Sequence, residues 1–385
     1  MPSTSPRLKV SHLGPIQSAD IAFGDLTVLV GPQASGKSVL LQTLKLVLDH
    51  RSIAERLERE GYEWGGDPAN FARLFYGEGM DGLWTDKTRV TWRGRVISLR
   101  GLAATKIGNA GVDSLFYAPA HRVMTLKNGW PRHFGDYSPG DPYVVRDFSE
   151  RLRKFIDMFL GKSSGDLWFA EVFLAPGTRL LLQPSIYGDF RLKQELNGLQ
   201  KRLVLQRGSE KSLPFMVWSA GQREFTPLLL GCSDVIESSL GQRKALDWVV
   251  LEEPEMGLHP RAITAVLFLV LELLHLGYRV CISTHSPHVL DLLWALRVFI
   301  EKGAKPEWVL KLFDVETQAE NMALAASILA KSIKVYYLDR EESKAVEISR
   351  LDAESASPHE TNWGGLTEFS ARASDIVAEF VANQP

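Results

Sequence analysis

The chain has 385 residues, of which 45% are hydrophobic and 23% are charged, and its formal net charge is −2. This composition is typical of a globular protein with one large or two ordinary domains, and it argues against nucleic-acid binding by a global basic field. The two cysteines, Cys232 and Cys281, each lie in an apolar run, which excludes a disulfide framework and favours buried thiols in a reducing compartment.

No membrane segment is predicted. The first ten residues, "MPSTSPRLKV", lack the apolar stretch of a secretory signal. The longest apolar stretch, residues 262–278, carries Glu272 and His275, so it predicts a buried helix rather than a membrane span. We therefore expect a cytoplasmic protein without a membrane partner.

The first elements along the chain are predicted strands that lead into a phosphate-binding loop. Residues 7–30 alternate as strands do, and "LTVLV" at their end is typical of a buried strand. The octapeptide "GPQASGKS" follows and satisfies G-x-x-x-x-G-K-S, and a helical pattern begins at Lys37. Such a loop curls its N–H groups around nucleotide phosphates, with Lys37 on the β- and γ-phosphates and the Ser38 hydroxyl on Mg²⁺. The predicted ATP site also includes the rest of the loop: Gly31, Pro32, Gln33, Ala34, Ser35 and Gly36.

The middle of the chain carries weaker patterns. Residues 51–115 are rich in turns and include a predicted strand pair at 88–101. An amphipathic helix is predicted at 144–160, and strands around a polar helical piece at 179–217. The basic residues of 191–207 alternate with glutamate and leucine, which is more typical of a solvated face than of a DNA groove. The absence of a long heptad run argues against a rod-like coiled-coil insertion.

A second donor-rich helix start occurs at "WSAGQREFTPLLLG", residues 218–231, before a predicted helix at 221–239. The Ser219 hydroxyl, the Gly221 N–H and the helix N-terminus together offer another anion site. Alternatively, Ser219 is an ordinary N-cap.

Carboxylates follow the next buried strand, in "DWVVLEEPEMGLHP" at 247–260. The apolar run delivers Glu252 and Glu253 to its carboxyl end, where α/β sheets bind ligands. We expect Glu252 to hold the Mg²⁺ shell and Glu253 to polarise the attacking water.

The strand after a helix predicted at 260–276 ends at a histidine, in "CISTHSPHVL" at 281–290. We expect His285 to contact the γ-phosphate or to orient water, and His288 to be structural. A helix is predicted at 287–296, and the chain then continues to a hairpin turning near 339–343 and a final helix.

The segments GPQASGKS, WSAGQRE, VVLEEPE and ISTHSP resemble, in this order, the P-loop, signature, Walker B and switch-histidine motifs of ABC-type ATPase heads. Over nearly its whole length the chain is similar to the SMC/RecF/OLD-like group of AAA-family ATPases. The resemblance implies an α/β fold: an ABC-type P-loop NTPase head over residues 1–385 with an N-terminal β-subdomain. It also implies an inserted β/helical region at about 45–215 and a C-terminal hairpin and helix at 330–385.

The sequence departs from the pattern of that group in three places. Glu252 stands where many ABC proteins have aspartate, and "MGLH" at 256–259 replaces the aspartate of the SMC-like D-loop. No glutamine loop is evident, and "FYAPAHR" at 116–122 occupies its place. The resemblance implies either that Arg122 acts at the nucleotide or that it is a structural arginine.

In ABC heads the signature caps the γ-phosphate that a neighbouring protomer binds. The resemblance therefore implies that Ser219, Gly221 and Gln222 contact ATP held by another copy, in a homo-oligomer that is at least a dimer.

Small standalone heads of this kind look most like the ATPase subunits of bacterial antiphage defence systems, with the PARIS type as the leading candidate. This likeness implies a sensor or scaffold for a separate effector, a nuclease or a toxin. A RecF/SMC-like ATPase that binds DNA in repair or recombination is the alternative. A transporter subunit is disfavoured because its signature usually reads LSGGQ. A fused nuclease is disfavoured because the acidic cluster after the histidine motif, at 339–342, lies in a predicted turn.

Overall fold

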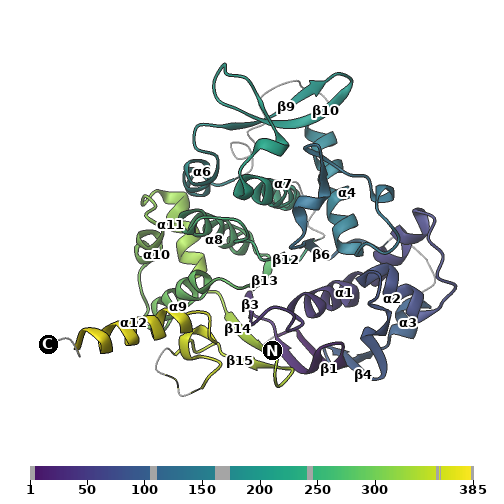
Figure 1. The fold of residues 1–385 in the computed structure, drawn as a ribbon, viewed down its shortest axis with the longest axis horizontal. Coiled ribbons are helices and arrows are strands. Elements are labelled where there is room, and N and C mark those ends of the chain that lie inside the picture. Colours follow the sequence, from purple (N-terminus) through teal and green to yellow (C-terminus); the bar gives the residue numbers. More distant parts are fainter. Residues whose placement is uncertain are drawn as a thin grey trace.

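The computed structural model describes residues 5–104, 111–160, 174–240, 246–352, 355 and 357–382. Its centre is one mixed sheet with the strand order β5-β4-β1-β2-β15-β14-β3-β13-β12-β6 (Figure 1). The predicted α/β class is confirmed. The strands of this sheet are β1 (Arg7–Leu13), β2 (Ile16–Ala22), β3 (Leu26–Val30), β4 (Trp84–Trp92), β5 (Arg95–Ile97), β6 (Leu115–Ala118), β12 (Trp248–Glu252), β13 (Arg279–Thr284), β14 (Ile333–Asp339) and β15 (Lys344–Glu347).

Half of the sheet is parallel. The strands β14, β3, β13, β12 and β6 pair in parallel, so their carboxyl ends meet at one edge. β3 and β12 read "LTVLV" and "WVVLE" and are buried at every position, as parallel strands covered on both faces must be. In the remaining part, β5, β4, β1 and β2 pair antiparallel and β2 pairs with β15 in parallel, and the antiparallel β14–β15 hairpin joins this extension to the parallel half.

Two hydrophobic cores cover the two faces of the sheet. Along β12, Val249 and Leu251 enter one core together with residues of α7 and α8, while Trp248 and Val250 enter the other together with residues of α1. The two cysteines are buried, as predicted. The helices are α1 (Lys37–Arg59), α2 (Pro68–Tyr76), α3 (Leu99–Ala103), α4 (Tyr143–Leu160), α6 (Pro176–Leu182), α7 (Ala220–Leu240), α8 (Pro260–His275), α9 (Pro287–Glu301), α10 (Pro306–Phe313), α11 (Ala319–Ile328) and α12 (Glu368–Ala382).

The middle region, predicted as an inserted β/helical region at about 45–215, also contributes strands to the main sheet. These strands are β4, β5 and β6. Within 179–217, the helical turns of α6 and of a π-helix at Gln183–Tyr187 come first, and a hairpin of β9 (Arg191–Asn197) and β10 (Gln200–Gln206) follows. Its two-residue loop is Gly198-Leu199, and Gly198 has a φ of 63°, which fits a type II′ turn with glycine at the first central position.

This hairpin belongs to a separate three-stranded sheet, which lies at the top of Figure 1. β11 (Leu213–Pro214) pairs with β10. The two-stranded ribbon of β7 (Leu126–Lys127) and β8 (Trp130–Pro131) is a separate pair, in contact with β10 and α4.

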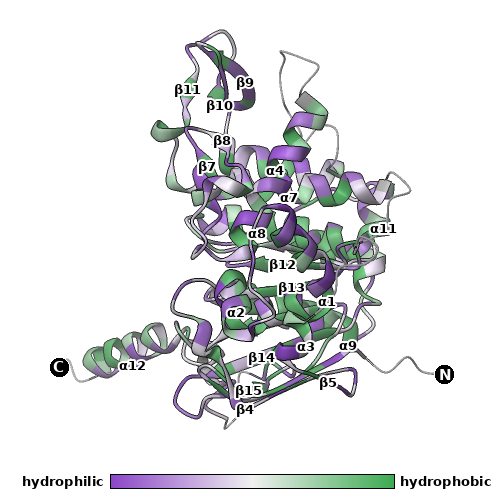
Figure 2. Ribbon diagram, turned by 90° about the vertical axis from the view of Figure 1, so that its right-hand side faces the viewer, coloured by the Kyte–Doolittle hydropathy of each residue, from purple (hydrophilic) through white to green (hydrophobic). Residues whose placement is uncertain are grey.

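The last helix, α12, projects from the body of the protein (Figures 1 and 2). The turn before it is anchored, because the Trp363 indole N–H donates to Asp291 of α9 at 2.8 Å. None of the side chains of α12 is buried. In the described part of the chain, no helix combines the length and apolar character that crossing a bilayer requires.

Candidate active site

Three of the predicted motifs meet at the carboxyl edge of the parallel half-sheet. β13 lies between β3 and β12, so the phosphate loop after Val30, the histidine segment after Thr284 and the carboxylates at Glu252–Glu253 end side by side (Figure 1). This edge is where open α/β sheets bind their ligands.

The phosphate loop has the backbone that its glycines allow. Gly31 has a φ of 145°, and a Cβ there would lie 2.4 Å from the carbonyl oxygen of Leu338. Gly36 has a φ of 97°, and a Cβ there would lie 2.7 Å from the side chain of Ile16. Ala34 also has a positive φ, 61°. The loop therefore turns tightly between β3 and α1, and larger residues at either glycine would push it from this path.

Lys37 folds back onto its own loop. Its ammonium donates to the carbonyl oxygens of Gly31 and Pro32, both at 2.8 Å, and lies 3.4 Å from the Ser35 hydroxyl. Burial lowers the pKa of Lys37 to about 8, and the charges of the carboxylates at 252, 253 and 255 oppose this shift. The lysine is thus buried in a site that lacks a strong anionic contact, and phosphate oxygens fit that need.

Glu252 is the last residue of β12 and is only 4% exposed. Its Oε2 accepts a hydrogen bond from the Ala120 N–H at 3.1 Å, whereas its Oε1 is buried and has no hydrogen-bond partner among the described residues. Burial raises the pKa of this carboxyl, and the neighbouring Ser38 hydroxyl lowers it. A buried carboxylate oxygen without a partner beside a hydroxyl fits a Mg²⁺ site, in which Ser38 and Glu252 would hold the ion or its water shell.

Glu253 and His285 form the second part of the site. Glu253 Oε1 lies 3.5 Å from His285 Nε2. Hydrogen bonding with His285 lowers the pKa of Glu253 despite partial burial, and the charge of Lys37 acts in the same direction. Glu253 also has a φ of 43°, a left-handed backbone that is unusual for a non-glycine residue. The turn directs an ionised carboxylate away from the buried strand and toward the histidine.

Arg122 lies behind these residues and is fully buried. Its Nε donates to the carbonyl oxygen of Glu224 at 2.9 Å, its Nη1 to that of Glu252 at 2.9 Å, and its Nη2 to that of Glu253 at 3.0 Å. Of the two alternatives left open by the sequence, this geometry favours a structural arginine, because all three donor nitrogens are used on the backbone.

Glu255, for which the sequence predicts no role, organises the end of β13. Its Oε1 accepts hydrogen bonds from the Thr284 hydroxyl at 2.6 Å and from the His285 N–H at 2.9 Å. Glu255 therefore positions the histidine segment against the turn that carries Glu253. The position of Glu255 three residues after Glu252 was visible in "EEPE", but its partners are about thirty residues away.

The signature segment, which we define as residues 219–223, forms the N-terminus of α7. The Gln222 N–H donates to the Ser219 hydroxyl at 3.2 Å, and the Ser219 N–H donates to the Gln222 side-chain oxygen at 3.1 Å. These reciprocal bonds make an N-terminal cap, so the ordinary capping role proposed for Ser219 is present. A Cβ on Gly221 would lie 3.0 Å from the Gly257 carbonyl oxygen, which explains the need for a small residue here.

The predicted site residues therefore fall into two groups. The phosphate loop, Glu252, Glu253 and His285 lie together at the sheet edge, and the charges of Glu252 and Glu253 act on Lys37. The signature segment packs instead against the turn at Gly257. Among the hydrogen bonds and ion pairs of the described residues, none joins this segment to the phosphate loop.

Comparisons with known proteins agree with part of this description. A family model with the description "AAA domain, putative AbiEii toxin, Type IV TA system" matches residues 152–291. This span is little more than a third of the chain. It includes the signature segment, Glu252, Glu253 and His285, and it does not include the phosphate loop. No curated protein sequence matches the chain.

Among solved structures, the chain is similar to an SMC head bound to the C-terminal winged-helix domain of ScpA, with 13% identity, a TM-score of 0.43 and coverage of 89% of this chain and 96% of that chain. It is also similar to the SMC head domain from Thermotoga maritima, with 13% identity, a TM-score of 0.34 and coverage of 74% and 90%. An ATP-binding subunit of an ABC transporter shows 12% identity, a TM-score of 0.36 and coverage of 94% and 99%. These similarities are low, and the strand order and loop geometry define the architecture without them.

Proposed function

We propose that the protein is a Mg²⁺-dependent ATPase. The observation that carries this proposal is the convergence of the phosphate loop, Glu252 and Glu253 at one sheet edge. Lys37 would exchange the carbonyl oxygens of Gly31 and Pro32 for phosphate oxygens, and a bound Mg²⁺ would neutralise phosphate charge. Glu253, which remains ionised because its pKa is lowered, would orient the attacking water together with His285.

The rate of ATP hydrolysis by the Glu253→Gln variant tests the assignment of Glu253 as a catalytic residue. The amide keeps the size of the side chain but removes its charge and basicity, so hydrolysis should fall by about 10²-fold or more, the scale of general-base catalysis. Binding of ATP and Mg²⁺ should survive, because Lys37, Ser38 and Glu252 remain. Glu320→Gln, on the exposed face of α11, is the matched control and should hydrolyse ATP at the rate of the unmodified protein. Normal hydrolysis by Glu253→Gln would show that the catalytic assignment is wrong.

The proposed ATPase acts as an oligomer with composite nucleotide sites. Ser219 is exposed, and its segment makes no hydrogen bond to the phosphate loop of the same chain within the described residues. A capped helix N-terminus of this kind can bind an anion that approaches from outside. In this proposal, the γ-phosphate bound by one copy contacts Ser219, Gly221 and Gln222 of another, so ATP holds the copies together.

The proposed cellular role is a sensor or scaffold in antiphage defence, with a separate nuclease or toxin as effector, as in PARIS-type systems. The sequence resemblance supports this role, and the matching family model is described by a toxin–antitoxin system. The apolar side chains of α12 also support a protein partner, because a helix of fifteen residues without a buried side chain is marginal in water. These exposed residues are Phe369, Ile376, Val377, Phe380 and Val381.

Gene neighbourhood and co-purification test the defence role. A small TOPRIM or HNH gene beside the gene for this chain, with a product that co-purifies with it, is the expected result. Neighbouring replication or repair genes, and no co-purifying effector, would favour the RecF/SMC-like alternative.

A further inference from the structure

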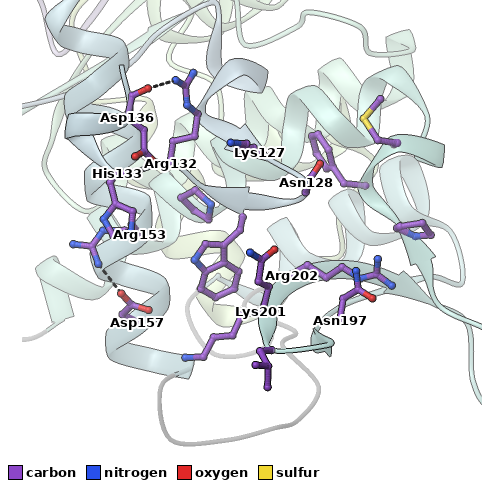
Figure 3. A pocket seen from close by; sticks show the side chains of 17 residues that line it. Lys127, Asn128, Arg132, His133, Asp136, Arg153, Asp157, Asn197, Lys201 and Arg202 are labelled. Carbon is purple, nitrogen blue, oxygen red and sulfur yellow. Dashed lines mark hydrogen bonds and ion pairs between the residues drawn. The ribbon is translucent and has the colours of Figure 1, made fainter. Parts of the chain in front are cut away.

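A cleft of about 800 Å³ lies away from the candidate active site, between the β7–β8 ribbon, α4 and the β9–β10 hairpin (Figure 3). We call it the cation cleft. Among the described residues, its walls contain five lysine or arginine side chains and two aspartates, in a chain whose net charge is −2. The charged residues are Lys127, Arg132, Arg153, Lys201 and Arg202 against Asp136 and Asp157.

Two of these cations are neutralised within the protein. Arg153 forms ion pairs with Glu150 at 2.7 Å and with Asp157 at 2.8 Å. Arg202 pairs with Glu195 at 2.6 Å. Because these two arginines are already paired with carboxylates, they contribute little positive charge to a ligand in the cleft.

The other three cations have no carboxylate partner among the described residues. The Arg132 guanidinium donates to the backbone oxygen of Asp136 at 2.5 Å, and its central carbon lies 3.8 Å from the centre of the Tyr137 ring. The Lys201 ammonium lies 5.9 Å from the centre of the Trp130 ring. Lys127 is exposed on the ribbon. Figure 3 shows Lys127 and Arg132 on one side of the hollow and Lys201 on the opposite side, so an extended anion fits them better than a single small one.

The uncharged lining indicates what the anion carries. Trp130, which is half-buried, supplies aromatic surface, whereas Phe215 is buried beneath the lining. The amide side chains of Asn128, Asn197 and Gln200 line the cleft and make no side-chain hydrogen bond within the described part of the chain. Aromatic surface for stacking, amides for base edges and cations for phosphates are the groups that single-stranded nucleic acid uses. An acidic peptide would use the same cations, so the test below compares the two ligands directly.

We propose that the cation cleft binds a short segment of single-stranded nucleic acid, with its phosphates on Lys127, Arg132 and Lys201 and a base against Trp130. This inference goes beyond the proposed ATPase and does not rest on it. It also revises the interpretation of residues 191–207 as only a solvated face: Lys201 and Arg202 of that segment line a concave site.

The test measures the anisotropy of a fluorescently labelled single-stranded 12-mer, as DNA and as RNA, with EDTA and without ATP. The double variant Lys127→Glu/Lys201→Glu should bind at least about tenfold more weakly than the unmodified protein, and its salt dependence should be shallower by roughly 0.7 per lost phosphate contact. The matched control is Lys302→Glu/Lys305→Glu, which changes the net charge equally at exposed sites outside the cleft. Its affinity should stay within about twofold of the unmodified protein, because the distant charges are screened.

Trp130→Leu tests the base contact separately. It should weaken binding about fivefold or more while leaving the salt slope unchanged, because stacking carries no counterion. Thermal melting of each variant checks that the fold is intact, and only variants that melt like the unmodified protein are compared.

Four results would overturn the proposal: no binding by the unmodified protein, equal losses in the two charge-reversal variants, no loss in Trp130→Leu, or tighter binding of a polyglutamate peptide than of the oligonucleotide. The last would indicate an acidic protein partner instead. Because ATP and Mg²⁺ are absent, none of these outcomes depends on whether the protein hydrolyses ATP, and a failed ATPase test leaves this result unaffected.

Discussion

Replacing Arg122 by methionine removes the guanidinium that joins α7 to the end of β12 while keeping most of the bulk of the side chain. The guanidinium donates to three backbone carbonyls. Each buried carbonyl that loses its donor costs about 1–3 kcal/mol, so three give roughly 3–9 kcal/mol. Two of the three hydrogen bonds are only partly buried, and removing a buried cation recovers some desolvation. We therefore expect a loss of about 3–5 kcal/mol, a large fraction of the roughly 5–15 kcal/mol that stabilises a typical domain.

Urea unfolding without nucleotide measures this loss, with Arg100→Met, at an exposed position on α3, as the matched control. The unfolding midpoint should fall clearly for Arg122→Met and stay unchanged for Arg100→Met. ATP binding to the folded fraction should persist, because the phosphate loop makes no hydrogen bond to Arg122 among those of the described residues. Unchanged stability together with lost ATP affinity would refute this reasoning and would place Arg122 at the nucleotide, the other alternative left by the sequence.

Three further predictions concern titration and buried charge. Burial lowers the pKa of Lys37 to about 8, and bound phosphate favours its charged form, so ATP binding slightly above pH 8 should be accompanied by proton uptake. Calorimetry in two buffers of different ionisation enthalpy measures the number of protons taken up, and the absence of uptake would contradict the prediction. Lys45→Met removes the cation that lies 2.8 Å from the buried Asp49 carboxylate, which keeps only backbone donors, and it should cost about 3–5 kcal/mol in urea unfolding. Lys334→Met, which breaks an exposed pair with Glu347, should cost under about 1 kcal/mol, and similar losses in the two variants would count against the buried pair. Burial opposes ionisation of Asp113, yet the pKa of this carboxyl is lowered to about 2, chiefly by the charge of Lys45. Its contribution to stability is therefore present above the unfolded pKa of 3.8 and is lost as the pH falls toward 2. Asp113→Asn should make stability less dependent on pH in this acid range, and an unchanged dependence would contradict the prediction.

The parts of the site that the sequence predicted are local patterns. A buried strand, a glycine-rich loop and a helix start follow one another at β3, and the carboxylates and His285 each directly follow a buried strand. Because parallel strands bring their carboxyl ends to one edge, these local patterns suffice to place the groups together once the sheet is parallel.

The parts that the sequence did not predict depend on contacts between distant segments. Arg122 meets carbonyls 102, 130 and 131 residues away, and no local pattern distinguishes it from an arginine at the nucleotide. The partners of Glu255 depend on β12 and β13 being neighbours. The sequence predicts strands around a helical piece at 179–217, whereas in the structure the helical turns precede the β9–β10 hairpin. The mixed leucine and charged residues of 191–207 do not distinguish a strand from a helix.

The central claim, that ATP joins copies of the chain through composite sites, is tested by light scattering of Glu253→Gln with and without ATP. The account predicts an ATP-dependent increase in mass to at least a dimer, because ATP is bound but not hydrolysed. Adding Ser219→Arg should abolish that increase, whereas adding Ser209→Arg, at an exposed position in the loop before β11, should preserve it. Adding Ser219→Ala separates loss of the helix cap from added bulk, and it should reduce the assembly less than arginine does. A mass of Glu253→Gln that is indifferent to both ATP and Ser219→Arg would contradict the composite site.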